Sequence, residues 1–477
     1  MNKAGTAEDP DPVPLILDVD GSLLLTDLLL ENLWAAMRAD FPAALRTVAT
    51  SIGNPARLKR RLLSIASPDP GSLPVRDAVL DLARQAAASG RPVSLVSGAD
   101  QGLVDALARE LGLPGRHFGS DGTTNLTGAS KARLLVSLFG EGGFDYVGNA
   151  PDDLAVWEHA RRCVVVAPGA QVSRRLPALQ KPVEVIGSPW NLSSLIREMR
   201  PHQWAKNLLL LLPLLAAHGG PLQAVMSSLL AMVAFCAGSS SLYIVNDMLD
   251  LADDRRHPTK RSRPLASGAL PLDVAMVASV CLGAIAVTLS WMVSPTVTGL
   301  LALYMAISLA YSLSWKHKRW VDLLVLATLY MLRVVAGAAA SDIAVSVWLV
   351  AFCFAVFSTL GIVKRLTDLA RATHRGALPG RGYSVANMDG LQYLAWASIV
   401  ASVAVFLGYS FTRHAATLYS SPWLLRLATI PIAVWLVRMV TLSRQGREDF
   451  DPMIFVAHDR IGLKIAAVGV ALVLLSI

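Results

Sequence analysis

Charged residues are scarce in this 477-residue chain, because Asp, Glu, Lys and Arg make up only 16% of it while 53% is hydrophobic. Such a composition is too apolar for an ordinary soluble protein. Cysteine is rare too, and the four cysteines stand apart at Cys163, Cys236, Cys281 and Cys353. Their spacing indicates neither a disulfide framework nor a zinc site. The net charge of +8 needs no nucleic acid to explain it, because the basic residues gather between apolar stretches.

The apolar residues are concentrated in the second part of the chain. Residues 1–190 predict a soluble domain with a linker, and residues 191–477 predict an all-α membrane domain of nine transmembrane helices. Each expected helix approaches the roughly 20 residues that cross a bilayer, although the first is short. They cover residues 207–218, 222–245, 271–293, 296–314, 321–340, 343–363, 391–410, 422–440 and 461–477.

The placement of Lys and Arg predicts the orientation of these helices. Basic residues follow the second, fourth, sixth and eighth stretches, and few lie on the opposite side. By the positive-inside rule, the amino-terminal domain and the polar connections face the cytoplasm. The carboxyl end then lies outside, and we expect a multi-pass protein of the inner (cytoplasmic) membrane.

Three segments of the soluble domain read as buried strands that end in polar side chains. They cover residues 14–23, 92–98 and 144–153. Their polar residues are Asp18, Asp20, Ser97, Asn149 and Asp153. Predicted helices over 75–88 and 132–139 alternate with the strands, which is typical of a Rossmann-like α/β domain with its chemistry at the strand carboxyl ends. Residues 25–67 predict a small helical cap, and residues 168–200 a plain linker.

Together with Lys131, these segments resemble the haloacid dehalogenase-like phosphatase superfamily over roughly residues 12–170. The resemblance implies that Asp18 is the nucleophile for a phosphoryl group and that Asp20 is the general acid and base. Ser97 would bind phosphate, and Lys131 would steady the phosphorylated intermediate. The implied Mg²⁺ ligands are Asp18, Asp20, Asn149 and Asp153. Because the family usually has Asp at the position of Asn149, an active phosphatase and a degenerate or regulatory domain both stay open.

A carboxylate cluster follows the second apolar stretch. Asn246, Asp250 and Asp254 recur every four residues, and Asp247 lies three residues before Asp250, so on a helix these side chains should converge on one face. Carboxylates at a membrane surface indicate function. Mg²⁺ reaches proteins through one or two carboxylates and substrate phosphates, so a diphosphate is the expected ligand. Basic residues that suit phosphate follow at Arg255, Lys260 and Arg261.

Other polar residues flank the remaining apolar stretches. The candidates for phosphate and ribose contacts are Lys206, Asn207, Tyr311, Lys316, Asp322, Arg333 and Lys364. Arg333 falls within a predicted span, where a charged side chain should face a partner. A polar mouth above an apolar bundle suits an amphiphile with an anionic head and a lipid tail.

The pattern Asn-Asp-x-x-Asp-x-x-x-Asp at 246–254 resembles the UbiA superfamily of intramembrane prenyltransferases, over about residues 195–477. Segments elsewhere resemble its decaprenyl-phosphate phosphoribosyltransferase branch, namely residues 200–207, 311–322, 333–337 and 382–384. The second Asp-x-x-x-Asp motif of aromatic-prenylating members is absent, since Leu326 stands four residues after Asp322.

The branch implies Mg²⁺-dependent transfer of 5-phosphoribose from phosphoribosyl pyrophosphate to polyprenyl phosphate, with release of pyrophosphate. Asp247, Asp250 and Asp254 would hold the metal. The pairing of the two domains suggests that Asp18 then removes the 5-phosphate. The resulting polyprenyl-phosphoryl-ribose would be a precursor of an arabinose donor for cell envelope biogenesis.

Three alternatives stay open at this point. The membrane domain could move an allylic polyprenyl group from its diphosphate to an aromatic or lipid acceptor. It could be a transporter or channel, although the polar groups gather on one face instead of near the midplane. Finally, the amino-terminal domain could be a non-catalytic scaffold or sensor.

Overall fold

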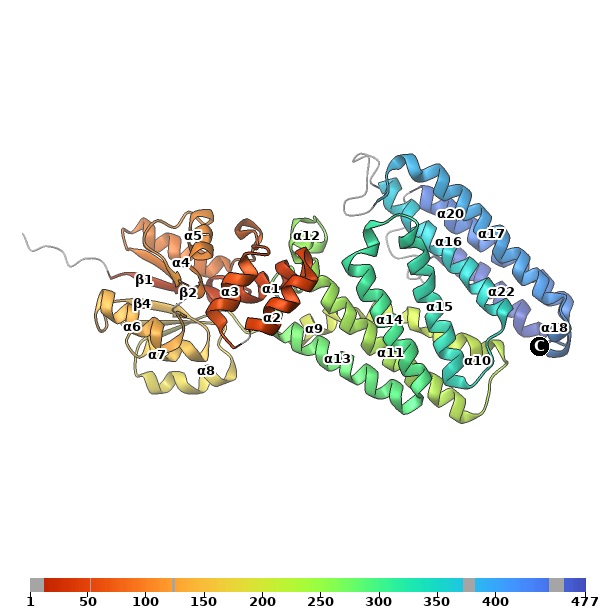
Figure 1. Ribbon diagram of the computed structural model, residues 1–477, viewed down its shortest axis with the longest axis horizontal. Coiled ribbons are helices and arrows are strands. Elements are labelled where there is room, and N and C mark those ends of the chain that lie inside the picture. Colours follow the sequence, from red (N-terminus) through yellow and green to blue (C-terminus); the bar gives the residue numbers. More distant parts are fainter. Residues whose placement is uncertain (1–12, 52, 122–124, 372–381, 446–458) are drawn as a thin grey trace, which may run out of the picture. The chain divides into compact units, whose positions relative to one another are not determined.

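The computed structural model describes residues 13–51, 53–121, 125–371, 382–445 and 459–477 (Figure 1). The chain divides into two compact units that do not follow chain order. The first unit combines Met1–Met199 with Ile244–Ala278, and the second combines Arg200–Tyr243 with Ser279–Ile477. The segment that carries the predicted carboxylate cluster therefore packs with the amino-terminal residues, so the units cut across the expected division at residue 190.

A six-stranded parallel sheet forms the centre of the first unit, in the order β3-β2-β1-β4-β5-β6. The strands are β1 (Leu15–Asp18), β2 (Val93–Asp100), β3 (Phe118–Ser120), β4 (Asp145–Gly148), β5 (Arg162–Val166) and β6 (Val183–Ile186). The strand order reverses between β1 and β4, and ligands of such sheets bind outside the strand carboxyl ends at this switch point. The predicted Rossmann-like sheet is confirmed.

Helices cover both faces of this sheet (Figure 1). They are α4 (Asp77–Ala88), α5 (Gln101–Glu110), α6 (Gly128–Phe139), α7 (Leu154–Trp157) and α8 (Ala170–Arg175), whereas α9 (Leu192–Glu198) follows the last strand. Leu15 and Leu17 pack in one core with α4 and α5, whereas Ile16 packs in the other with α6 and α7. Because both faces of the sheet are buried, the residues of β1 that point to either face are apolar. The strand is therefore a continuous apolar run in the sequence.

Three helices form the predicted cap between β1 and α4. They are α1 (Leu28–Ala39), α2 (Phe41–Ser51) and α3 (Pro55–Leu63). Ala36, Ala44 and Leu62 form a small core between them. Asp27 caps α1 and Asn54 caps α3, because each side chain accepts a hydrogen bond from the backbone three residues later. We call α1–α3 the helical insertion.

The prediction of a plain linker over residues 168–200 is wrong. This stretch contains α8, β6 and α9, and β6 pairs in parallel with β5 as an edge strand. Val183 and Val185 are 38% and 54% exposed. An edge strand that is exposed on alternate residues lacks the apolar run that marked the inner strands.

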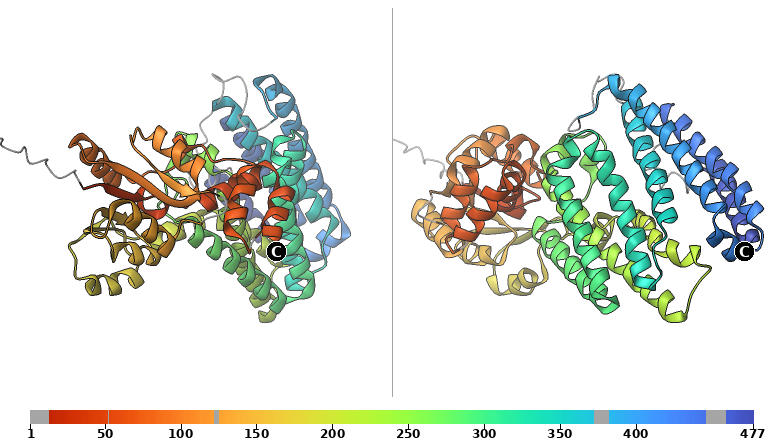
Figure 2. Two further views of the ribbon diagram at one scale, coloured as in Figure 1. Left: turned by 60° about the vertical axis from the view of Figure 1, so that its left-hand side comes forward. Right: turned by 45° about the vertical axis from the view of Figure 1, so that its right-hand side comes forward.

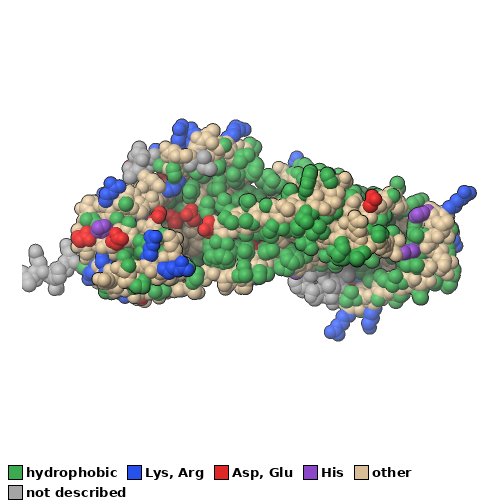
Figure 3. All heavy atoms as spheres, turned by 90° about the horizontal axis from the view of Figure 1, so that it is seen from below, with side chains coloured by type: hydrophobic (Ala, Val, Ile, Leu, Met, Phe, Trp, Pro, Cys, Tyr) green, Lys and Arg blue, Asp and Glu red, His purple; other side chains and the backbone are tan. Residues whose placement is uncertain are grey.

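Long apolar helices build the second unit, and both views of Figure 2 show the last of them packed side by side. The helices are η5 (Pro201–Leu211), α10 (Leu212–Ala216), α11 (Leu222–Leu249), α13 (Leu272–Val293), α14 (Pro295–Leu313), η7 (Trp315–His317), α15 (Val321–Ser341), α16 (Val347–Arg371), α17 (Met388–Ser410), α18 (Arg413–Leu418), α19 (Pro422–Leu427), α20 (Thr429–Arg444) and α22 (Arg460–Ser476). Helices α11 and α13 each extend into the first unit. On the face drawn in Figure 3, hydrophobic side chains are more numerous than charged ones and are interspersed with backbone and other side chains.

Seven helices of the described residues are long and apolar enough to cross a membrane, so the nine predicted spans are not confirmed. The first predicted span is divided between the 3-10 helix η5 and the short α10, and the last, α22, has 17 residues. Close packing explains the irregular first segment. A Cβ at Gly337 of α15 would lie 1.9 Å from the carbonyl oxygen of Leu210, so only glycine admits η5 at this distance.

Candidate functional site

Asp18 is the centre of a polar cluster at the carboxyl end of β1. Its Oδ1 accepts a hydrogen bond from Lys131 Nζ at 2.6 Å, and its Oδ2 accepts one from Ser22 Oγ at 3.0 Å. Asp18 and Lys131 are each 5% exposed. Burial raises the pKa of Asp18 to about 7, although the Lys131 ammonium acts against it. A carboxyl group that has a raised pKa and lies beside one cation at a strand end is typical of a reactive site.

Asp20 and Ser97 lie beside Asp18 because β1 and β2 are paired. Asp18 is in register with Val96, so Ser97 follows at the same sheet edge. Asp20 Oδ2 accepts a hydrogen bond from Ser97 Oγ at 2.8 Å, and Oδ1 accepts one from the backbone nitrogen of Leu28 at 2.8 Å. Asp20 therefore contacts both the sheet and the first residue of α1.

Asn149 approaches from the other side, after β4. Its Oδ1 lies 3.1 Å from Ser22 Oγ, so this hydroxyl bridges Asn149 and Asp18. Among the described residues, no three His, Cys, Asp or Glu side chains gather as a metal site. The Asp18 carboxylate and the Asn149 amide oxygen are nevertheless hard donors that meet at one hydroxyl, and such oxygens fit Mg²⁺ when water completes its ligands.

Asp153 lies deeper in the cluster. Its Oδ1 accepts a hydrogen bond from the Tyr146 hydroxyl at 2.6 Å, and its Oδ2 accepts two from the backbone nitrogens of Asn149 and Ala150, each at 2.9 Å. Tyr146 in turn lies 3.1 Å from Lys131 Nζ. Asp153 therefore holds the loop after β4 and orients Lys131, and its role as a metal ligand stays a prediction.

Lys59 of the helical insertion also belongs to this cluster, although the sequence did not single it out. Its Nζ donates to the carbonyl oxygen of Gly98 at 2.5 Å and to Asn125 Oδ1 at 2.9 Å. Burial lowers the pKa of Lys59, while the nearby carboxylates of Asp20 and Asp27 act against this. No local pattern marks Lys59, because only the fold of the insertion brings it to the sheet edge.

The carboxylate cluster of 246–254 does not form one continuous helix face. Helix α11 ends at Leu249, Asp250 has φ −99° and ψ 10°, and α12 (Leu251–Arg256) begins after it. Asp250 lies at this break with its Oδ1 2.5 Å from Arg38 Nη1, and its convergence with Asp247 and Asp254 stays a prediction. Asp247 and Asp254 still converge, with Asp247 Oδ1 at 3.1 Å and Asp254 Oδ2 at 2.5 Å from Arg263 Nη1.

The pair of Asp247 and Asp254 is buried, and its surroundings are cationic. Each side chain is 2% exposed. Lys260 Nζ lies 3.4 Å from Asp254 Oδ1, beside the Arg263 contact. Burial raises the pKa of Asp254, whereas Arg263 and Lys260 act against it. Two carboxylate oxygens that converge on one cationic nitrogen are a donor set that fits Mg²⁺.

Asp250 shares its cation with Asp253. Arg38 of α1 places Nη1 2.5 Å from Asp250 Oδ1 and Nη2 2.5 Å from Asp253 Oδ2. Of the other predicted residues in this segment, Asn246 Nδ2 lies 3.4 Å from Asp247 Oδ1 and Arg261 is exposed.

Arg255 is paired within the first unit. Its guanidinium binds the carboxylate of Glu31 through two nitrogens, at 2.6 and 3.0 Å. Both side chains are buried, with exposed fractions of 7% for Arg255 and 4% for Glu31. The predicted phosphate contact of Arg255 therefore stays a prediction.

Arg333 lies inside α15 of the second unit and faces protein acceptors. Its Nε donates to Asn207 Oδ1 at 2.8 Å, Nη1 to the carbonyl oxygen of Leu329 at 2.7 Å, and Nη2 to the Tyr304 hydroxyl at 2.8 Å. The expectation that a charged residue in a span faces a partner is confirmed. These contacts tie η5, α14 and α15 together, and a substrate contact of Arg333 or Asn207 stays a prediction.

Asp322 forms a second buried network with Arg365, which sequence reasoning left out of the site. Arg365 Nε and Nη2 bind Asp322 Oδ2 and Oδ1 at 2.5 and 2.9 Å, and the Tyr311 hydroxyl donates to Asp322 Oδ1 at 2.7 Å. Arg365 is 1% exposed and Asp322 is fully buried. The network joins α14, α15 and α16, so its first role is to hold these helices.

Three predicted lysines lie elsewhere in the second unit. Lys206 is buried, with Nζ 5.9 Å from the centroid of the Tyr330 ring. Lys316 in η7 and Lys364 in α16 are half-buried. Their predicted roles are untested by these positions.

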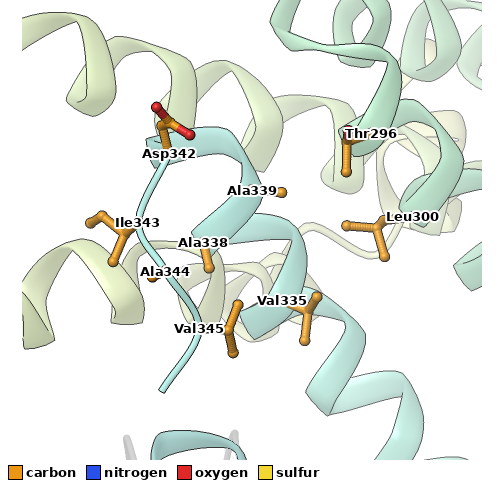
Figure 4. Close-up of a pocket in the computed structure, with 9 residues that line it drawn as sticks. All are labelled: Thr296, Leu300, Val335, Ala338, Ala339, Asp342, Ile343, Ala344 and Val345. Carbon is orange, nitrogen blue, oxygen red and sulfur yellow. The ribbon is translucent and has the colours of Figure 1, made fainter. Parts of the chain in front are cut away.

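An open cavity of about 500 Å³ lies between the start of α14 and the end of α15 (Figure 4). Its lining is apolar except for Thr296 and Asp342, and Figure 4 shows Val335, Ala338 and Leu300 around it. None of the predicted site residues lines this cavity.

Comparison with known proteins identifies the second part of the chain. The UbiA prenyltransferase family matches residues 208–458. The uncharacterized protein y4nM of Sinorhizobium fredii is 32% identical over 95% of this chain and 89% of its own length. Decaprenyl-phosphate phosphoribosyltransferase of Mycobacterium tuberculosis is 33% identical over 52% of this chain and 83% of its own length.

A solved structure is similar as well. The structure of a UbiA homologue from Archaeoglobus fulgidus bound to GPP and Mg²⁺ is 16% identical, covers 60% of this chain and all of its own, and has a TM-score of 0.45. The amino-terminal part has a parallel sheet with Asp18 at the carboxyl end of β1. The chain belongs to the UbiA prenyltransferase family.

Proposed function

We propose that this protein transfers 5-phosphoribose from phosphoribosyl pyrophosphate to a polyprenyl phosphate in the membrane, with Mg²⁺ as cofactor. The observation that carries the proposal is the convergence of the buried Asp247 and Asp254 on Arg263 Nη1, with Lys260 beside them. The similarity to decaprenyl-phosphate phosphoribosyltransferase over 52% of the chain supports the choice of substrates.

In this proposal Asp247 and Asp254, with Asp250, would hold Mg²⁺, which would neutralise charge on the departing pyrophosphate. The compact Lys260 ammonium and the planar Arg261 guanidinium bind the remaining oxygens of the pyrophosphate. An oxygen of the lipid phosphate attacks the anomeric carbon, and the bond from that carbon to the pyrophosphate oxygen breaks with its electrons. No protein nucleophile takes part.

The amino-terminal domain then removes the 5-phosphate of the new lipid. An Asp18 oxygen attacks the phosphorus while Asp20 gives its proton to the departing ribose 5-oxygen. Water, deprotonated by Asp20, releases inorganic phosphate from Asp18. The contact of Lys131 with Asp18 at 2.6 Å supports this assignment, because a cation there neutralises the phosphorylated carboxyl group.

We further propose that segment 201–216 and α22 join the seven long helices as the two remaining spans, in an inner membrane with both sites in the cytoplasm. The basic connections carry this orientation. A cysteine-accessibility scan that labels residue 477 only from the cytoplasmic side would contradict it.

The test is to incubate membranes that contain the protein with Mg²⁺, polyprenyl phosphate and phosphoribosyl pyrophosphate labelled in the ribose carbons. We expect label in the lipid phase from the wild type and from Asp273→Asn, which alters an exposed carboxylate nearby. Asp247→Ala and Asp254→Ala should lose it. Absence of label from the folded wild type, together with transfer from an allylic diphosphate, would replace this proposal with prenyl transfer.

A further inference from the structure

Helix α1 of the helical insertion contacts both polar sites of the first unit. Its first residue, Leu28, donates its backbone N–H to Asp20 of the phosphatase-like cluster at 2.8 Å. Its last turn carries Arg38, which binds Asp250 and Asp253. A helix of 12 residues spans about 18 Å, so one rigid element connects the two sets of carboxylates.

Arg38 binds where α11 breaks. Besides the two carboxylates, Nη1 donates to the carbonyl oxygen of Leu249, the last residue of α11, at 3.1 Å. This carbonyl lacks a partner within its own helix, and a cation there also suits the helix dipole. One guanidinium therefore holds the end of α11, the residue at the break and the first turn of α12. The direction in which Asp250 points depends on it.

A buried ion pair fixes α1 against the same segment. Glu31 of α1 receives two hydrogen bonds from Arg255, and the Thr26 hydroxyl donates to Glu31 Oε1 at 2.6 Å. Arg255 Nε also donates to the carbonyl oxygen of Ala266 at 3.1 Å. Glu31 lies about two helical turns before Arg38 in α1, so this anchored helix limits the positions that the Arg38 side chain can take.

We propose that Arg38 is a positioning residue of the transferase, supplied by the insertion of the phosphatase-like domain. It sets the break at Asp250, so that Asp250 joins Asp247 and Asp254 in binding the metal-bound pyrophosphate. This inference rests on the proposed function. It also gives the fusion a physical meaning, because the transferase needs a side chain that the amino-terminal domain carries.

The experiment compares Arg38→Gln, which keeps a hydrogen-bond donor but loses the charge, with Arg38→Lys and the wild type. The first readout is Mn²⁺ binding to the full-length protein in lipid nanodiscs, followed by electron paramagnetic resonance, with Asp247→Ala to identify the transferase signal. Changes to residues that orient metal ligands commonly cost about 10- to 100-fold in affinity. We expect a loss of at least about tenfold in Arg38→Gln and a smaller one in Arg38→Lys.

A matched control exists at the same surface. Asp69 pairs with Arg256 at 2.9 Å, but both are exposed, so Asp69→Asn should bind Mn²⁺ as the wild type does. Hydrolysis of a small phosphate ester should be unchanged in all these variants, which reports an intact amino-terminal domain. Hydrogen exchange at residues 249–254 should be faster in Arg38→Gln than in the wild type.

The outcomes separate the two claims. Wild-type Mn²⁺ affinity and exchange in Arg38→Gln would overturn the role of Arg38. A second outcome is that Arg38→Gln loses Mn²⁺ binding while the wild type transfers no label from phosphoribosyl pyrophosphate. This result would support the role of Arg38 and reject the proposed substrate. If Arg38→Gln fails to fold, Arg38→Lys decides, because wild-type Mn²⁺ affinity and wild-type hydrogen exchange in that variant would overturn the role of Arg38.

Discussion

The phosphatase-like cluster and the Asp322–Arg365 network are both buried and charged, yet they differ in how their charges are used. Asp18 contacts one cation, Lys131, and one hydroxyl, Ser22, at a sheet edge where the strand order reverses. Asp322 has both carboxylate oxygens bound by Arg365, and Tyr311 adds a third donor. In the first arrangement the Asp18 carboxyl group can take part in a reaction, whereas in the second the charges of Asp322 and Arg365 hold helices together.

The difference teaches that a charged residue in an apolar segment has two distinct uses. Function is a sound first hypothesis for such a residue. A buried pair whose donors and acceptors are mutually satisfied is also a structural joint, and its loss leaves an uncompensated charge. Activity and stability measurements on matched variants separate the two uses.

The largest effect is expected for Asp18→Asn, because removal of a nucleophile abolishes covalent catalysis. Ester hydrolysis should fall at least on the order of a thousandfold, measured as released inorganic phosphate. The free energy of unfolding should change little, since Lys131 retains Asp153 at 3.8 Å. Hydrolysis that persists in this variant would show that Asp18 is not the nucleophile.

Asp322→Ala should act in the opposite way, on stability. The substitution leaves the Arg365 guanidinium buried. The Asp368 carboxylate of the same helix, α16, still binds it at 2.8 Å. The expected cost is about 3–5 kcal/mol of unfolding free energy, measured by denaturant unfolding in detergent. Asp322→Ala combined with Arg365→Leu should recover much of it. Normal stability with lost transfer would instead make Asp322 a substrate contact.

Gly337→Ala should have a smaller effect, again on stability. The added Cβ would meet the Leu210 carbonyl oxygen at 1.9 Å and push η5 away from α15. Overpacking of this kind costs about 1–3 kcal/mol. Gly299→Ala is the control, because nothing lies within 4 Å of a Cβ there and alanine favours the helix. Equal thermal unfolding of both variants would contradict the close approach.

The smallest effect is expected for Ser22→Ala. It removes the hydroxyl between Asp18 and Asn149, and a hydrogen bond of this kind contributes about 1 kcal/mol. Ester hydrolysis should slow by a few-fold to about tenfold, and the free energy of unfolding should fall by about 1 kcal/mol. Ser137→Ala, on an exposed helix face, should match the wild type. A rate equal to that of the control would remove Ser22 from the site.

The sheet and the polar residues at its edge could be predicted from sequence because their signals are local. An apolar strand followed at once by Asp18 and Asp20 needs no knowledge of the rest of the chain. Parallel pairing then gathers Ser97 and Asn149 at the same edge. The edge strand β6 escaped because its exposed valines alternate with other residues.

The partners of the charged residues could not be predicted, because they come from distant parts of the chain. Arg38 meets Asp250, Lys59 meets Gly98, and Arg365 meets Asp322 only after the helices have packed. Helical periodicity also assumed that α11 continues past Asp250. The cation at the break is supplied from outside the helix, so its own sequence does not reveal it.

The most direct test of the account uses phosphoribosyl pyrophosphate labelled with ¹⁴C in the ribose and ³²P in the 5-phosphate. Wild-type membranes should place ¹⁴C in the lipid phase and release ³²P as inorganic phosphate, whereas Asp18→Asn should retain both labels in the lipid. A lipid that carries both labels in the wild type, or neither label at all, would contradict two consecutive steps on one chain.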